Sequence, residues 1–304
     1  MNLLNGEFSD LMLIHGNGYN RISKVKLFLA SFLFFIKFTS FITYFMRVIN
    51  RRGIRFVNYH DFHTSDISNF SSQLDYLSKF YHLLNPNQIE SFFNGDFNTN
   101  KNGLIITFDD GLSSQFNYAY PILKKRGIEP IFFIPPDFIN SAESKQSKSF
   151  ADKHQIEYYL NSNTEIAMSW EQVKEIAFVG SHTMSHCRML ESISLSDIQY
   201  EMSQSKKILE EFTNKKIHDF CWVGGELNTY SKQAFQVAVN SGYDNLYTSN
   251  NSIHTKTSSS KFINRNNLEA CYPISLTAFQ TCGLTDFLYF KKRKSVYKKL
   301  HDIK

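Results

Sequence analysis

Proline and glycine are scarce in this chain, which has 6 Pro and 13 Gly among its 304 residues. Both residue types supply the tight turns of small all-β proteins, so their scarcity argues against a turn-dense β-sandwich. Cysteine is also rare, and the four cysteines have no regular spacing: Cys187, Cys221, Cys271 and Cys282. The sequence therefore predicts reduced thiols in a reducing compartment rather than a disulfide scaffold.

Aromatic residues are abundant instead, with 29 Phe and 16 Tyr. Hydrophobic residues make up 42% of the chain and charged residues 20%, which excludes a disordered, collagen-like or low-complexity protein. Large aromatic side chains bury much apolar area, so a sizeable core is expected. The length suits one large α/β barrel or two small domains.

Positive charge gathers at the two ends of the chain. Residues 1–60 carry 8 Lys and Arg against 2 Asp and Glu, and residues 285–304 carry 7 against 2. The remainder carries 18 against 24 and is acidic. Because the basic N-terminal part flanks an apolar run, the expected partner of these ends is an anionic membrane surface and not nucleic acid.

Residues 27–46 form a mostly apolar run with Lys37 at its centre. A central Lys is costly in a spanning helix, so we expect an amphipathic helix that lies in the membrane interface. A spanning helix and a buried core helix remain alternatives. Four arginines follow at once and favour a body on the cytoplasmic side, peripheral or anchored at the inner face of the cell membrane: Arg47, Arg51, Arg52 and Arg55.

Apolar strands alternate with amphipathic helices in the rest of the chain, which predicts an α/β protein with a parallel sheet or barrel. Residues 135–165 are polar and are predicted to be an inserted loop. We divide the chain into a membrane-facing N-terminal extension (1–53), a catalytic domain (54–284) and a basic C-terminal tail (285–304). The predicted strands include 54–59, 103–108, 131–134 and 246–248. The predicted helices include 70–81, 116–125 and 231–241. Two more helices are predicted to begin at capping boxes, at Ser169 and at Ser196.

Two adjacent acids, Asp109 and Asp110, directly follow the apolar run 103–108. Ligands gather at the carboxyl ends of parallel strands, so this pair is a candidate functional site. Ordinary turn chemistry explains an Asp-Asp-Gly sequence equally well when it stands alone.

His182 and His186 are four residues apart, a spacing that can aim two imidazoles at one ion. A carboxylate with two imidazoles suits Zn²⁺, Co²⁺ or Fe²⁺ and leaves positions open for water and substrate.

These two segments together resemble the first two motifs of the polysaccharide deacetylases, also called the NodB-homology enzymes or carbohydrate esterase family 4. The motif residues are 107–111 (TFDDG) and 181–186 (SHTMSH), and the resemblance extends over roughly residues 54–250. It implies a distorted (β/α) barrel and the metal-dependent hydrolysis of an N-acetyl group on a sugar. It also implies that Asp109 is the general base and that Asp110, His182 and His186 hold one divalent metal ion, with Zn²⁺ the first choice.

The third motif departs from the pattern of the family. Residues 220–225 (FCWVGG) lack the usual Arg and Pro, but Trp222 can form an aromatic wall and the Gly224 N–H can serve an oxyanion. A plain strand that ends in a Gly turn is the alternative. His60, at the end of the strand 54–59, is predicted to have a substrate-binding or supporting role, with a packed core histidine as the alternative.

The proton donor of the family has no evident counterpart in the sequence. His254 lies in a polar stretch, where a solvated loop histidine is the simpler interpretation. Arg265 is a weak candidate for orienting an acid, and an exposed surface position is its default interpretation.

The sequence thus predicts a hydrolase that deacetylates an amino sugar of a surface polysaccharide or of its lipid-linked precursor. A related deacylase, such as a deformylase on the same fold, is one alternative. A non-catalytic glycan-binding or assembly protein is another, and the altered third motif supports it.

Overall fold

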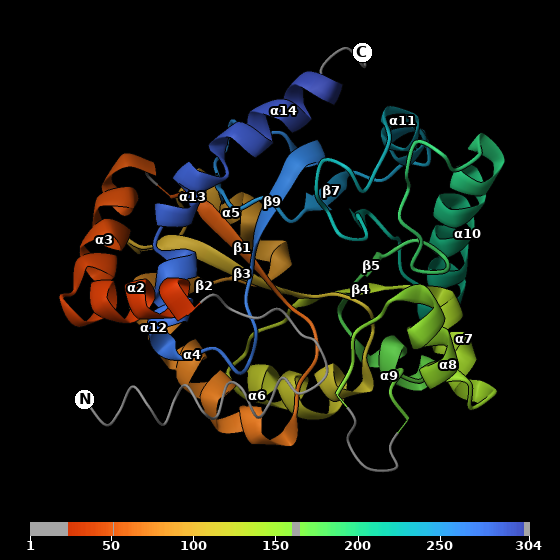
Figure 1. Ribbon diagram of the computed structural model, residues 1–304, viewed down its shortest axis with the longest axis horizontal. Helices are drawn as coiled ribbons and strands as arrows, with labels where there is room; N and C mark the ends of the chain where they lie inside the picture. Colours follow the sequence, from red (N-terminus) through yellow and green to blue (C-terminus); the bar gives the residue numbers. More distant parts are fainter. Residues whose placement is uncertain (1–23, 51, 160–164, 301–304) are drawn as a thin grey trace.

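Seven parallel strands form a closed barrel in the computed structural model, which describes residues 24–50, 52–159 and 165–300 (Figure 1). The barrel closes because β1 pairs with β3 on one side and with β9 on the other. This confirms the predicted (β/α) barrel. In barrel order the strands are β1 (Ile54–Tyr59), β3 (Asn102–Phe108), β4 (Ile131–Ile134), β5 (Phe178–Ser181), β6 (Asp219–Cys221), β7 (Asn245–Thr248) and β9 (Ile263–Asn267).

Two short strands distort the barrel at the amino ends of its strands. β2 (Tyr81–Leu83) runs parallel to the start of β3, and β8 (Ile253–His254) runs antiparallel to the start of β1. β4 and β9 then pair only with later residues of β3 and β1. The carboxyl ends of the parallel strands therefore remain together at the opposite end of the barrel, where the motif residues follow them.

Helices surround the barrel, as expected for parallel strands buried on both faces (Figure 1). The prediction of a loop over 135–165 is wrong where α7 (Pro136–Glu143) and α8 (Ser147–His154) lie. The exposed residues of both helices are polar, which gave the segment its polar composition. The helices are α4 (Ile67–Phe80), α5 (Ile89–Asn94), α6 (Tyr120–Lys125), α7 (Pro136–Glu143), α8 (Ser147–His154), α9 (Trp170–Glu175), α10 (Leu195–Thr213), α11 (Lys232–Asn240), α12 (Ile274–Thr281), α13 (Leu284–Leu288) and α14 (Phe290–Leu300).

Helix starts follow local capping chemistry. The Ser169 hydroxyl accepts a hydrogen bond from the Gln172 N–H, so the predicted capping box at α9 is confirmed. The cap of α10 is Ser194 rather than Ser196, two residues before the predicted start. The predicted helix 116–125 begins as a π-helix (Gln115–Ala119) and continues as α6.

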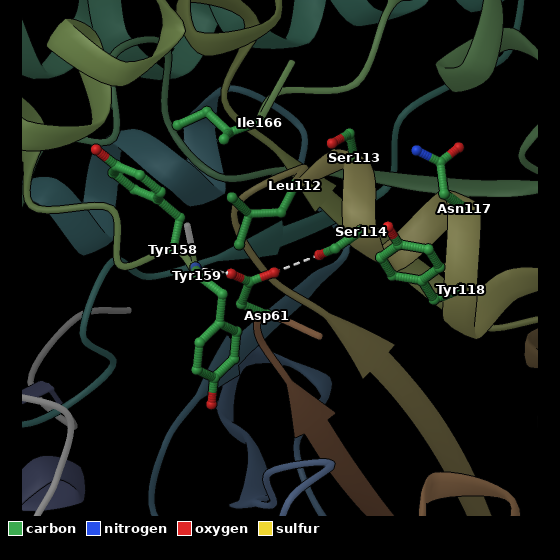
Figure 2. Close-up of a pocket in the computed structure, with 9 residues that line it drawn as sticks. All are labelled: Asp61, Leu112, Ser113, Ser114, Asn117, Tyr118, Tyr158, Tyr159 and Ile166. Carbon is green, nitrogen blue, oxygen red and sulfur yellow. Dashed lines mark hydrogen bonds between the residues drawn. The ribbon is translucent and has the colours of Figure 1, made fainter. Parts of the chain in front are cut away.

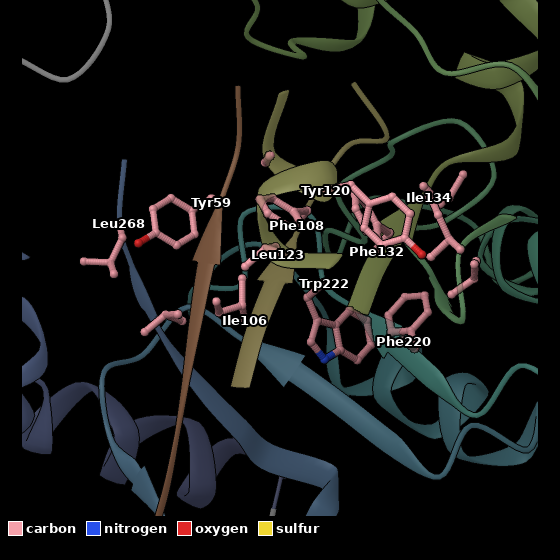
Figure 3. Close-up of a cluster of buried hydrophobic side chains, with 14 of the residues drawn as sticks. Tyr59, Ile106, Phe108, Tyr120, Leu123, Phe132, Ile134, Phe220, Trp222 and Leu268 are labelled. Atoms are coloured by element: carbon pink, nitrogen blue, oxygen red, sulfur yellow. The ribbon is translucent and has the colours of Figure 1, made fainter. Parts of the chain in front are cut away.

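The core follows the two-residue period of the strands. Ile106 and Phe108 of β3 pack outward against the helices, whereas Ile105 points into the barrel interior. Phe133 and Tyr247 also belong to the interior cluster, with ring centroids 4.8 Å apart. Figure 3 shows part of the outer cluster, in which aromatic and aliphatic side chains from neighbouring strands lie together.

The N-terminal segment forms two helices instead of the single helix predicted for residues 27–46. α2 (Lys24–Phe35) and α3 (Phe38–Asn50) are bent by 77° at a break where Lys37 has a φ of 58°. Within the described residues no single helix has the length and apolar composition to cross a membrane, although this bent pair meets both criteria together. α2 packs against α12 through the buried side chains of Leu27 and Ala30.

Candidate metal and catalytic site

The candidate site lies at the carboxyl ends of four strands of the barrel, the neighbours β1 and β3 and the neighbours β5 and β6, with β4 between the two pairs. His60 follows β1, the two aspartates follow β3, His182 follows β5 and Trp222 follows β6. Because parallel strands present their carboxyl ends at one edge, residues more than 100 positions apart in sequence meet there.

Asp110, His182 and His186 form a compact set of three metal-ligating side chains. The Asp110 Oδ1 lies 3.4 Å from the His182 Nε2 and 3.2 Å from the His186 Nε2. All three ligating atoms lie within 4.8 Å of one another. Burial alone would raise the pKa of Asp110, but the two imidazoles hold it well below its usual value.

The other nitrogen of each imidazole is already engaged. His182 Nδ1 lies 2.9 Å from the Cys221 carbonyl oxygen, and His186 Nδ1 lies 2.8 Å from the His154 carbonyl oxygen. A carbonyl only accepts hydrogen bonds, so each Nδ1 is the donor, and in the neutral imidazole each Nε2 then carries a lone pair on the side of Asp110. This donor set therefore fits a divalent metal ion in chemistry and in direction.

Backbone strain and a buried glutamate shape the turn that carries the two histidines. Thr183 and His186 have φ values of 64° and 58°, in the left-handed region that non-glycine residues rarely adopt. The Glu201 carboxylate of α10 accepts hydrogen bonds from the Met184 N–H, at 2.8 Å, and from the Ser185 N–H, at 2.9 Å. Glu201 thus holds the turn in the strained form that brings both Nε2 atoms to Asp110.

Asp109 points away from this set and into a different environment. Arg265 donates to both of its carboxylate oxygens, with Nη1 to Oδ1 at 2.6 Å and Nη2 to Oδ2 at 2.7 Å. Burial raises the pKa of Asp109, but the guanidinium outweighs it and the net pKa is lowered. The carboxylate is therefore ionised at neutral pH while only 4% of the residue is exposed.

A second group of candidate ligands, Asp109, His182 and Cys221, lies deeper in the same place. It fits a metal less well. Both Asp109 oxygens already bind Arg265, whose Nη2 also lies 2.8 Å from the Cys221 Sγ. Burial raises the pKa of the Cys221 thiol well above its usual value, which keeps it in the protonated form that is a poor ligand.

His60 lies between two carboxylates at the mouth of the site. Its Nε2 is 3.9 Å from the Asp109 Oδ2, and its Nδ1 is 3.4 Å from the Glu269 Oε1. Burial would lower its pKa, but Glu269 and the two site aspartates raise it to about 10. The side chain is 30% exposed, so a protonated imidazolium faces both the solvent and the proposed base.

A small pocket adjoins the site on the side of the turn after Asp110 and the start of the π-helix Gln115–Ala119. Asp61 forms its floor and accepts hydrogen bonds from the Ser114 hydroxyl and the Tyr159 N–H (Figure 2). Asp61 directly follows His60, which joins the pocket to the catalytic edge. The lining combines tyrosine rings with hydroxyl and amide groups: Ser113, Ser114, Asn117, Tyr118, Tyr158 and Tyr159, with Leu112 and Ile166 completing it.

The residues of the third motif lie at the end of β6. Trp222 is 1% exposed, and its ring stacks on Tyr230 with centroids 4.4 Å apart and lies against Phe220 (Figure 3). Gly224 is exposed and has a φ of 78°, and a Cβ there would meet the Thr229 side chain at 2.9 Å. The substrate contacts expected of Trp222 and Gly224 therefore stay predictions, with the indole seated in the core.

Two residues differ from their simplest sequence interpretation. Arg265 is fully buried rather than on the surface, because β9 brings it into the barrel beside Asp109. His254 is half-buried on β8, pairs with Ile54 at the amino end of β1 and packs against Phe56, far from the carboxyl edge. The sequence carries no signal that Glu201 or Glu269 has a role at the site, since neither lies in a motif.

Comparison with known proteins agrees with this geometry. Residues 96–246 match the family model described as polysaccharide deacetylase. The chain is 28% identical over 167 residues to YxkH of Bacillus subtilis (strain 168), whose curated name places it among the polysaccharide deacetylases. The match covers 54% of this chain and 50% of YxkH, so the chain spans about half the length of that relative.

Solved structures share the fold at low sequence identity. The Streptococcus pyogenes deacetylase PplD, in complex with acetate, superposes with a TM-score of 0.58 at 19% identity, covering 75% of this chain and 97% of PplD. IcaB from Ammonifex degensii gives 0.55 at 20% identity, covering 77% and 97%. The BpsB deacetylase domain from Bordetella bronchiseptica gives 0.54 at 14% identity, covering 72% and 96%. These structures show that the chain shares their barrel, and the matching family model identifies it as a member of the polysaccharide deacetylase family.

Proposed function

We propose that the protein is a metal-dependent N-deacetylase that acts on an amino sugar of a surface polysaccharide or of its lipid-linked precursor. The observation that carries the proposal is the separation of the two neighbouring aspartates. Asp110 faces the two imidazoles, and Asp109 faces an arginine and a histidine. One site thus offers a metal position next to an ionised carboxylate that is free of the metal.

A divalent metal, with Zn²⁺ the first choice, would be held by Asp110, His182 and His186 and would supply Lewis-acid chemistry that polarises the amide carbonyl and makes water more acidic. Asp109 accepts the proton of the attacking water. Arg265 keeps Asp109 ionised and orients it, and each carboxylate oxygen retains a lone pair that Arg265 does not use.

In this proposal His60 protonates the leaving amine. Its neighbouring carboxylates raise its pKa to about 10, which favours the imidazolium at neutral pH, and its Nε2 lies 3.9 Å from the Asp109 Oδ2. When the carbon–nitrogen bond breaks, the amine nitrogen takes a proton from the His60 Nε2, and acetate and the free amino sugar result. Glu269 then favours return of a proton to the imidazole.

The pocket beside the site carries groups that commonly contact sugars, namely tyrosine rings and an asparagine amide. Its free volume holds only about one water molecule, so in this proposal a glycan would contact these groups at the rim of the pocket and not inside it.

Acetate release from N-acetylhexosamine oligomers tests the proposal, with the metal content measured on the same samples. Asp109→Asn keeps the size of the side chain but cannot accept a proton, so turnover should fall about 10²–10⁴-fold with metal content unchanged. Asp110→Asn should lose metal first and regain some activity in excess metal. Release of acetate by Asp109→Asn at the wild-type rate would contradict the proposed function.

A further inference from the structure

α3 buries polar side chains and exposes apolar ones, which is the reverse of a surface helix in a water-soluble protein. Its buried residues are the polar Thr39 and Thr43, which are 0% and 7% exposed. Its outward side chains are large and apolar, with exposed fractions from 37% to 61%: Phe38, Phe41, Tyr44, Phe45, Val48 and Ile49. Exposure of such a face to water is unfavourable, so we expect this face to contact an apolar environment.

α2 extends this apolar surface while remaining attached to the body of the protein. Its inner side is held on α12 by the buried Leu27 and Ala30 and by a contact between the Ser31 and Ser275 hydroxyls at 3.3 Å. Its outer side exposes further large side chains: Val25, Phe28, Leu29, Phe32 and Phe35. The two helices are bent by 77° from each other. To cross a bilayer as one span, the pair would have to straighten and break the packing of α2 on α12, whereas a position along a surface keeps both.

The C-terminal helices adjoin the same surface, about 240 residues later in sequence. Met46 of α3 packs on Gly283, where an added Cβ would lie 2.8 Å from the Met46 Cγ. Gly283 is the N-cap of α13, which exposes Phe287 and Leu288 at 68% and 70%. Figure 1 shows α2 and α3, in red, beside α12 and α13, in blue, on one side of the molecule.

The charge around this surface is mainly positive. Residues 24–50 and 287–298 contain no Asp or Glu, and α14 carries exposed Lys291, Lys292 and Lys294 next to the apolar residues of α13. Lys292 pairs with the exposed Glu226 at 3.4 Å. α13 is fixed in position by a buried ion pair, in which both Arg55 guanidinium NH₂ groups donate to Asp286 at 2.9 Å. The basic helix therefore keeps a defined place beside the apolar face.

From these contacts we propose that α2, α3, α13 and α14 form one composite docking surface for an anionic lipid bilayer. The apolar side chains enter the level of the headgroups and upper acyl chains, and the lysines of α14 bind phosphate groups of the same leaflet. The proposal is independent of the proposed catalytic activity, because lipid binding is measured without a sugar substrate.

Vesicle sedimentation with the full-length protein tests this docking surface. Wild type should sediment with phosphatidylcholine vesicles that contain phosphatidylglycerol, should bind weakly to phosphatidylcholine alone, and should lose affinity as salt is raised. Phe41→Ser with Phe45→Ser should lower the affinity at least tenfold, and so should Phe287→Ser with Leu288→Ser. Lys291→Glu with Lys294→Glu should lower it by about tenfold for the anionic vesicles.

Matched controls come from the far side of the barrel. Tyr200→Ser on α10 removes an aromatic side chain of 55% exposure, and Lys145→Glu with Lys148→Glu reverses two exposed charges near α8. These variants should bind as wild type does, and all variants should melt at the wild-type temperature. The proposal would be overturned if wild type did not bind anionic vesicles, or if the docking variants bound them as tightly as the controls do. The proposal would also be overturned if the protein were a dimer in solution and Phe41→Ser with Phe45→Ser made it monomeric, because the surface would then bind a second copy of the chain.

Discussion

Arg265 forms a two-pronged ion pair with Asp109, in which two guanidinium nitrogens donate to the two carboxylate oxygens at 2.6 and 2.7 Å. The two residues are 156 positions apart and meet inside the barrel, beneath the metal-ligand set. The same Arg265 donates to the Thr107 hydroxyl at 2.9 Å, so its position is tied to β3 as well as to the carboxylate. A buried charge pair of this geometry gives the proposed base one orientation and one protonation state.

Replacement of Arg265 tests this relationship. Arg265→Lys keeps a positive charge but offers one donor position in place of a planar fork, so the lowered pKa of Asp109 should rise. The acid limb of the kcat/KM profile should then move to higher pH, and kcat at neutral pH should fall about 10–100-fold. The metal content should not change, because Arg265 does not contact the ligand set. An acid limb that stays in place would show that Arg265 serves only packing.

Glu269 sets the charge state of His60. Because Glu269 raises the pKa of His60, to about 10 together with the site aspartates, Glu269→Gln should lower it and move the basic limb of the kcat/KM profile to lower pH. The raised pKa of His60 also makes the free energy of unfolding depend on pH. The stabilisation from charged His60 is complete below its unfolded pKa of about 6.5 and is lost as pH rises through about 10. Glu226→Gln, at an exposed glutamate, is the control and should leave the pH profile of activity unchanged.

The strained turn between the histidines depends on Glu201. Glu201→Gln leaves one neutral oxygen for the two backbone N–H groups, which both bond Oε2, and replaces Oε1, the acceptor of the Ser185 hydroxyl, by an NH₂ group, so the turn should relax. We expect metal affinity to fall about 10–100-fold, measured by calorimetric titration of the metal-free protein. Glu211→Gln changes an exposed glutamate of the same helix and should bind metal as wild type does. Equal affinities in both variants would contradict the supporting role of Glu201.

The ion pair between Arg55 and Asp286 couples the barrel to α13. Both side chains are buried, with exposed fractions of 1% and 8%, so Asp286→Asn leaves a guanidinium without its counter-charge. The free energy of unfolding should fall by about 3–5 kcal/mol in urea titrations. Lys207→Ala breaks an exposed pair with Glu211 and should cost no more than about 0.5 kcal/mol. A loss for Asp286→Asn as small as that of the control would mean that α13 is held by other contacts.

The parts of the fold that could be predicted from sequence are those with a local signal. The strands 103–108 and 131–134 are runs of mainly apolar residues, the strand 54–59 is rich in β-branched and aromatic residues, and the helix after Ser169 has its own cap. Hydrogen bonds and side-chain periodicity within one segment decide such elements, so they can be read without knowledge of the rest. The motif residues at the strand ends can be recognised for the same reason, since each motif is a short continuous segment of the sequence.

Longer-range pairing decided what the sequence pattern missed. β9 has the sequence INRNN, which shows no apolar alternation, yet it closes the barrel between β1 and β7. The burial of Arg265 follows from that pairing, and so does its contact with Asp109. The helices within residues 135–165 were hidden because their exposed faces are polar and only short apolar stripes reach the core.

The alternation of strands and helices, the two motifs and the apolar, basic character of the chain ends can all be recognised in the amino-acid sequence. Each of these depends on neighbouring residues or on composition alone. Three other features follow from tertiary contacts: Asp109 and Asp110 have different partners, Glu269 lies beside His60, and α3 turns its polar side inward. These facts depend on which distant segments the closed barrel brings together, and no local pattern of side chains contains that information.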